Sequence, residues 1–135
     1  MGFLNRLLRR EKNKKEVVDA NGIKVTELEE LCSQPEVYEA LRNTMILDPQ
    51  KIVISYEDAL SRAKEFEKAK ENLRAAIWYR IAGGLAIYEG NVLNVKKCFS
   101  KYAELTKKSL KILEIPEKAV EKAQEYYKKY LKRKI

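Results

Sequence analysis

The chain has 135 residues, of which 45% are hydrophobic and 36% are charged. This length fits one domain, and the apolar content suffices for a core. Histidine, the most common general base and zinc ligand, is absent, and two cysteines alone cannot form a structural zinc site. No glycine-rich phosphate loop follows a strand-like run. Composition therefore argues against an enzyme and predicts no cofactor, no metal and no small-molecule substrate.

Positive charge is concentrated at the two ends. Residues 1–15 and residues 118–135 each carry a net charge of +5, whereas residues 16–117 carry −2. We expect an anionic partner to meet these ends, the alternative being solvated charge that aids solubility. The many Lys and Glu residues are typical of heat-adapted proteins. No run is long and apolar enough to span a bilayer, and no secretory signal is present, which predicts a cytoplasmic protein.

The first ten residues predict a short basic amphipathic helix. Its apolar side chains recur at helical spacing, and its cations lie away from them. Such an arm favours docking on an anionic membrane surface, which would make the protein peripheral; the alternative is a helix folded back on the bundle. The residues concerned are Phe3, Leu4, Arg6, Leu7, Leu8, Arg9 and Arg10. The pattern predicts an arm and linker over residues 1–22 and a helical bundle over residues 23–135.

Two short helices are predicted at the start of the bundle. Thr26 and Glu29 have the spacing of a capping box, which indicates the first. Ser33 and Pro35 suit the start of the second. We expect that second helix to end near residues 48–50, because the residue before a proline avoids helical angles.

Residues 51–55, "KIVIS", are β-branched and short. They predict an extended connector that buries Ile52 and Ile54, because no other segment would pair with a strand here. A strand is the alternative.

Helical periodicity then continues over residues 56–89, after Ser55 as a good N-cap. A single helix of this length is rare in one domain, so we expect a break near residues 71–72. Gly90 suits the left-handed position that ends a helix.

Two more helices complete the prediction. One runs from Val92 towards Leu113, and Pro116 opens the last at the favoured first position. The last helix ends in "EYYKKYLKRK", where tyrosines alternate with cations as on RNA-binding surfaces. The alternative contact residues for RNA or a partner are Tyr126, Lys128, Lys129, Tyr130, Lys132 and Arg133. Tyr127 is expected in the core.

Two adjacent glycines, Gly83 and Gly84, interrupt the otherwise helical stretch "WYRIAGGLAIYEGN". Each costs about 1 kcal/mol relative to alanine in a helix. The pair therefore predicts close packing of a neighbouring helix against bare backbone, the alternative being a ligand that approaches the backbone. Trp78, in the same stretch, is expected to be largely buried between helices.

Residues 56–105 resemble tetratricopeptide (TPR) repeats. Trp78 matches the aromatic that opens the first helix of a repeat, Gly83 matches the small residue, and Phe99 matches the aromatic of the second helix. Residues 73–134 resemble the microtubule-interacting and transport (MIT) domain, a three-helix relative with a long middle helix. Both resemblances imply an antiparallel helical array that binds peptides or helices in grooves between its own helices.

These observations predict an all-α protein built as an antiparallel helical array, a TPR- or MIT-like bundle with a short basic amphipathic arm. Its expected function is that of a non-catalytic adaptor that binds a peptide or partner helix, with the arm on an anionic membrane. The alternative is a basic helical protein that associates with RNA or the ribosome. The oligomeric state stays open.

Overall fold

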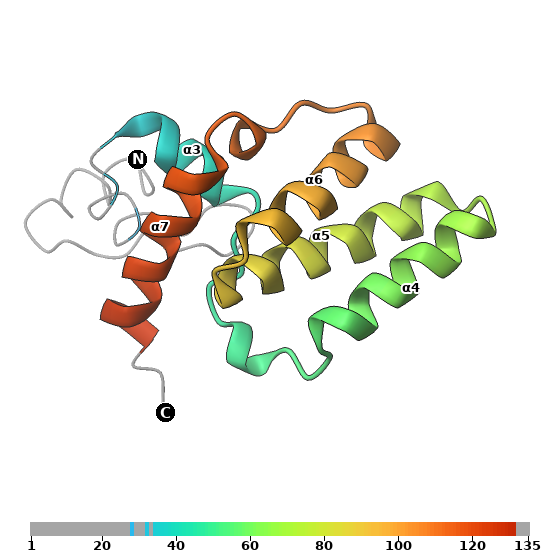
Figure 1. Cartoon of the computed structure of the whole chain (residues 1–135), viewed down its shortest axis with the longest axis horizontal. Coiled ribbons are helices and arrows are strands. Elements are labelled where there is room, and N and C mark those ends of the chain that lie inside the picture. Colours follow the sequence, from blue (N-terminus) through green and yellow to red (C-terminus); the bar gives the residue numbers. More distant parts are fainter. Residues whose placement is uncertain (1–27, 29–31, 33, 132–135) are drawn as a thin grey trace, which may run out of the picture.

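The computed structural model describes residue 28, residue 32 and residues 34–131. The predicted arm, the predicted capping box and the ends of the chain lie outside these residues. Every regular element in the described part is helical, so the all-α prediction is confirmed. Helices α4 (Tyr56–Lys68), α5 (Asn72–Glu89) and α6 (Val92–Thr106) form an antiparallel layer with α5 in the middle (Figure 1). Helices α3 (Pro35–Arg42) and α7 (Pro116–Tyr126) pack together at one end of that layer.

The predicted break between α4 and α5 is confirmed. Lys70 adopts a left-handed φ of 60° between the two helices. The N-cap assigned to Ser55 is also confirmed, since its hydroxyl oxygen accepts the backbone N–H of Asp58 at 3.1 Å. Gly90 ends α5 with a φ of 75°, the conformation for which glycine was expected there.

Helix α3 is shorter than the sequence indicates, and the prediction that it reaches residues 48–50 is wrong. It ends at Arg42, and the Thr44 hydroxyl donates to the Ala40 carbonyl at 2.7 Å. The chain then turns so that Ile46 lies against α5, where its backbone carbonyl accepts the hydroxyl of Tyr127. Tertiary contacts therefore decide this boundary, and they carry no local sequence signal.

The connector prediction for residues 51–55 is confirmed. A 3₁₀ turn, η1 (Pro49–Lys51), precedes it, and no strand occurs among residues 34–131. Ile52 and Ile54 are partly buried against the core, while Val53 between them is fully exposed. The alternation is what an extended segment with one inward face requires.

Helix α6 ends at Thr106, so the prediction of a helix reaching Leu113 is wrong. The long middle helix that the MIT resemblance implies is therefore also wrong. Lys107 is left-handed at a φ of 59° and ends the helix without glycine or proline. A second 3₁₀ turn, η2 (Lys111–Leu113), then places Ile112 in the core with no exposed surface. The apolar residues beyond Thr106 have helical spacing, but the chain uses them to reach α3 and α7.

Pro116 opens α7 as predicted, and a π-helical turn, η3 (Tyr127–Leu131), continues it. Tyr127 is fully buried, as expected. Helix α7 also ties down the end of α5. The side-chain amide of Gln124 donates to the carbonyls of Ile87 at 2.7 Å and Tyr88 at 2.9 Å in the last turn of that helix. The Ile87 carbonyl also accepts the backbone N–H of Gly90 at 3.0 Å.

The glycine pair lies in the most crowded part of the core. A Cβ atom on Gly83 would sit 2.6 Å from the ring of Phe99 on α6. One on Gly84 would sit 2.6 Å from the side chain of Ile46. This geometry agrees with the close-packing interpretation, although only Gly83 faces a helix, and Gly84 faces the loop after α3.

Trp78 is partly buried, less than expected. It lies in the second turn of α5, because that helix already begins at Asn72. It therefore does not open the helix as its counterpart in the TPR resemblance does.

Candidate binding site

One face of α5 is uncovered along its first half. Residues 82–87 are all buried, but Ile77 is 51% exposed and Leu73 is 75% exposed. Leu73, Ile77 and Ile81 are four residues apart and so lie on one face of the helix. We call these three residues the α5 stripe. Leu73 and Ile77 are exposed and Ile81 is partly buried against the core. Neighbouring exposed apolar side chains of this size are a feature of binding surfaces.

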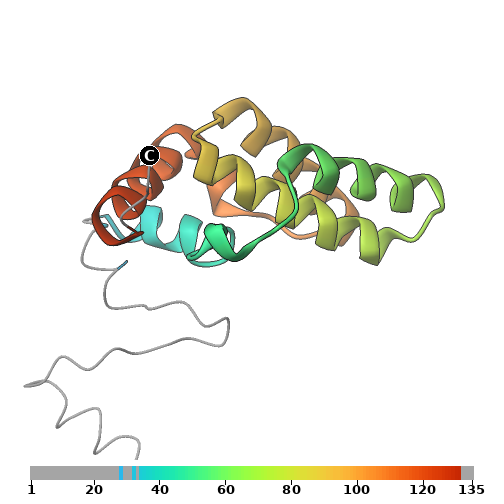
Figure 2. The same ribbon diagram turned by 90° about the horizontal axis from the view of Figure 1, so that it is seen from below.

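A cavity of about 280 Å³ lies beside the α5 stripe. Figure 2 shows the connection between α3 and α4 passing over α5, and η1 in that connection contacts the helix. The cavity is formed where this connection, α5 and α6 meet. Its lining includes Ile46, Ile52, Ile77, Arg80, Ile81 and Tyr102.

A second cavity, of about 290 Å³, shares Arg80 and Tyr102 with the first and extends to Lys108 and Leu110. The two cavities and the α5 stripe together form what we call the α5 groove. Its apolar surface comes from α5, from the connector and from the end of α6, three segments that the sequence does not place together.

The charged side chains that line the α5 groove are all positive. Arg80 and Lys108 are both exposed, and no carboxylate lines either cavity. Within residues 34–131 neither cation has an ion-pair partner. By contrast Arg74, on the same helix, pairs with Glu71 at 3.2 Å.

A polar cluster holds the three helices of the layer together close to the α5 groove. Glu67 on α4 accepts the hydroxyl of Tyr79 on α5 at 2.6 Å and the ammonium of Lys101 on α6 at 2.6 Å. The hydrogen bond from Lys101, followed by that from Tyr79, lowers the pKa of the Glu67 carboxyl. Burial raises the pKa of Tyr79, so its hydroxyl stays a donor. Because Lys101 directly precedes Tyr102, this cluster fixes one wall of the α5 groove.

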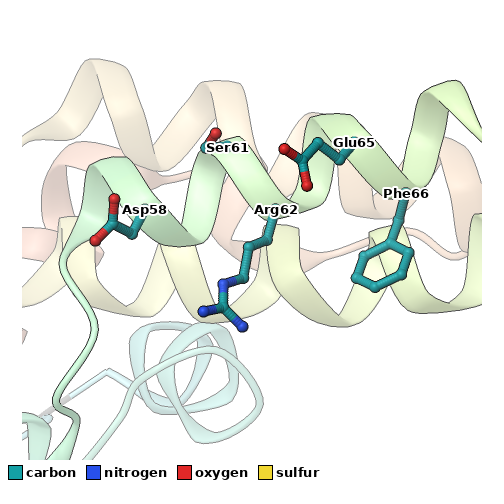
Figure 3. A pocket seen from close by; sticks show the side chains of 5 residues that line it. All are labelled: Asp58, Ser61, Arg62, Glu65 and Phe66. Atoms are coloured by element: carbon teal, nitrogen blue, oxygen red, sulfur yellow. The ribbon is translucent and has the colours of Figure 1, made fainter.

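A further hollow, of about 500 Å³, lies along α4 and is shown in Figure 3. Its five lining residues, Asp58, Ser61, Arg62, Glu65 and Phe66, all come from this one helix. The guanidinium of Arg62 lies 5.0 Å from the centre of the Trp78 ring, so the cation already has an aromatic partner. With both charge signs and no second wall, this hollow is an ordinary solvated helix face.

The buried thiols offer no nucleophile. Both Cys32 and Cys98 are buried and free, and burial raises the pKa of each thiol. The Cys98 thiol donates to the hydroxyl of Tyr56 at 3.7 Å, inside the core. Neutral thiols are poor nucleophiles.

The described residues form neither a metal site nor a membrane span. That part of the chain has no cluster of three or more acidic, cysteine or histidine side chains able to hold a metal. Nor does it contain a helix whose length and apolarity would let it cross a bilayer.

The predicted contact residues near the C-terminus have mixed positions. Tyr126 is buried and packs edge-on against Tyr127, so its ring is not open to a base or a partner. Lys128 and Lys129 are exposed, and the ammonium of Lys129 lies 5.3 Å from the centre of the partly buried Tyr130 ring. Lys132 and Arg133, like all seven arm residues, lie outside the described residues.

Sequence reasoning did not find the α5 groove. Leu73, Ile77 and Ile81 belong to the helical periodicity predicted for residues 56–89, but this periodicity does not show whether another segment covers them. Arg80, next to Ile81, was the available signal, because arginine is seldom fully buried.

Comparison of the chain with family models, with curated proteins and with solved structures found no match. The fold itself defines a class of architecture: an antiparallel helical array with an apolar groove on its central helix. The TPR and MIT resemblances stay predictions from the sequence.

Proposed function

We propose that this protein is a non-catalytic interaction adaptor whose α5 groove binds a peptide or partner helix. The observation that carries the proposal is the exposed α5 stripe beside a preformed apolar cavity. Amphipathic helices bind in such grooves through apolar anchors spaced three or four residues apart. A groove already formed in the free protein lowers the ordering cost of binding.

The dimensions suit a short helix. Leu73 and Ile81 are eight residues apart, which corresponds to roughly 12 Å along the helix axis. Two to three turns of a partner helix cover this length. The chain's own Ile46 already lies against Gly84, farther along the same helix. A partner side chain would continue that contact towards the start of α5.

The test is selection of binders from a displayed library of 16-residue helical peptides, panned on the immobilised full chain. We expect binders whose affinity falls about tenfold with Ile77→Ser and falls clearly with Leu73→Ser, because anchoring apolar contacts dominate such interfaces. Failure to select any binder, or binders indifferent to both substitutions, would refute the proposal.

Leu93→Ser is the matched control. Leu93 is 74% exposed and Leu73 is 75% exposed, and each is the second residue of its helix. Neither residue lines a cavity of the α5 groove, but Leu73 shares a helix face with Ile77 and Ile81, which do, whereas Leu93 lies on α6. The two substitutions therefore remove the same exposed side chain from equivalent helix positions, and only Leu73→Ser is expected to weaken binding.

The basic arm is a separate part of the proposal and rests on the sequence alone. Phe3, Leu4, Leu7 and Leu8 with three arginines would hold the bundle at an anionic bilayer. Deleting residues 1–15 should abolish pelleting with vesicles of mixed neutral and anionic phospholipid while leaving the melting temperature nearly unchanged. If the arm instead packs on the bundle, truncation should lower the melting temperature and leave vesicle binding as it was.

A further inference from the structure

We infer that the α5 groove selects a partner helix that carries acidic side chains beside its apolar anchors. This inference rests on the proposed function and adds the chemistry of the partner. It comes from the charge of the groove, since both cavities lack a carboxylate and both have Arg80 in their lining.

Arg80 stands where the two cavities join. It belongs to both linings, and on α5 it lies between Ile77 and Ile81 of the α5 stripe. Lys108 adds a second cation at the far end of the second cavity. A partner helix lying on the stripe therefore brings its flank against Arg80 and against the second cavity, which Lys108 also lines.

Because these two cations are unpaired, we expect the partner to carry negative charge where it meets them. A cation that loses water in an interface without gaining a counter-charge destabilises the complex. Exposed cations elsewhere on the described helices, such as Lys97, stay in water when the groove is filled, whereas Arg80 and Lys108 line the cavities and no carboxylate lines them. Arg80 and Lys108 have no carboxylate partner in the described part of the chain, so acidic side chains on the flank of the partner helix would supply the counter-charge.

A second copy of this chain fits the groove poorly. The net charge of +8 and the repeated Arg80 would bring like charges together at a symmetric interface. A flat anionic bilayer would meet the cations but would leave the concave cavities unfilled. An acidic amphipathic helix satisfies both the charge and the shape of the groove.

The experiment reads the composition of the selected peptide pool and then the effect of charge reversal. We expect binders enriched in Asp and Glu, three or four residues from their apolar anchors. A pool of binders that depends on Ile77 but is neutral or basic would overturn this inference and leave the proposed function standing. A library that yields no binder would instead refute the proposed function.

For a selected acidic peptide, Arg80→Glu should weaken binding about tenfold, and added salt should weaken binding to the unmodified chain. Lys97→Glu is the control, because Lys97 is an exposed cation on α6 that lines neither cavity and changes the net charge equally. Equal losses for the two variants would show long-range attraction only and would overturn the inference. The inference would also be overturned if Arg80→Glu weakened binding to anionic vesicles and the library yielded no acidic peptides.

Discussion

The two halves of α5 both carry apolar side chains but differ in their surroundings. From Ala82 to Ile87 every residue is buried, with α6 against Gly83 and the loop after α3 against Gly84. From Leu73 to Ile81 the same helix face is uncovered or only partly covered. The connection between α3 and α4 passes over α5 (Figure 2), and its Ile46 and Ile52 line a cavity with Ile77 and Ile81, while Leu73 stays 75% exposed.

This difference separates two roles for apolar side chains. In the second half they are core, so changes in their volume should affect stability. In the first half Ala75 and Tyr79 are also core, but Leu73 and Ile77 are exposed, so changes at these two positions should affect binding and leave stability nearly unchanged. The predictions below compare the halves, beginning with the largest expected effect.

The second half should tolerate no added volume at Gly83. Gly83→Leu is expected to destabilise the fold by about 1–3 kcal/mol through overpacking, because a Cβ at this position already lies 2.6 Å from the fully buried Phe99 ring. Chemical denaturation monitored by circular dichroism measures this difference.

The neighbouring glycine gives the internal control for that prediction. Gly84→Ala meets Ile46, a flexible and only partly buried side chain, and gains about 1 kcal/mol of helix propensity. We expect Gly84→Ala to be close to neutral and Gly83→Ala to be clearly less stable than it. Equal effects at the two positions would contradict the packing described for them.

The polar cluster in the first half should contribute less and should depend on pH. Glu67→Gln is expected to cost about 1 kcal/mol near neutral pH, since it weakens two partly exposed hydrogen bonds. The pKa of Glu67 is lowered in the folded state, so its contribution is present above the ordinary value of 4.5. It is lost as the pH falls through the lowered pKa.

The difference in unfolding free energy between the unmodified chain and Glu67→Gln should therefore shrink as the pH falls below 4.5 and through the lowered pKa of Glu67. Denaturant titrations at a series of pH values measure it. A difference that does not change with pH would mean that Glu67 is not held ionised by Lys101 and Tyr79.

The smallest effect is expected on the α5 stripe. Leu73→Ser and Leu93→Ser should each change stability by less than about 0.5 kcal/mol, because both side chains are mostly exposed. Thermal unfolding of the two variants measures this. A large loss for Leu73→Ser alone would show that the first half of α5 is covered after all.

Much of the fold could be predicted from the sequence, because local chemistry determines it. The Ser55 cap, the break between α4 and α5, the left-handed Gly90 and the start of α7 at Pro116 each have a local signal. The ends of α3 and α6 have none. Ile46 and Ile112 leave helical spacing to reach distant parts of the core, and no residue near them marks a stop.

The α5 groove escaped prediction for a related reason. Helical spacing shows which residues share a face, but it does not show whether another segment covers that face. The connection between α3 and α4 covers Gly84 and not Leu73, and this depends on its path through space.

The central claim is that the first half of α5 is a binding face. Amide chemical shifts of the ¹⁵N-labelled full chain, recorded while a selected acidic peptide is added, test it most directly. We predict the largest changes at Leu73, Ile77, Arg80 and Ile81, with a further change at Lys108. Largest changes on α4 or around Leu93, with the α5 stripe unaffected, would contradict the claim.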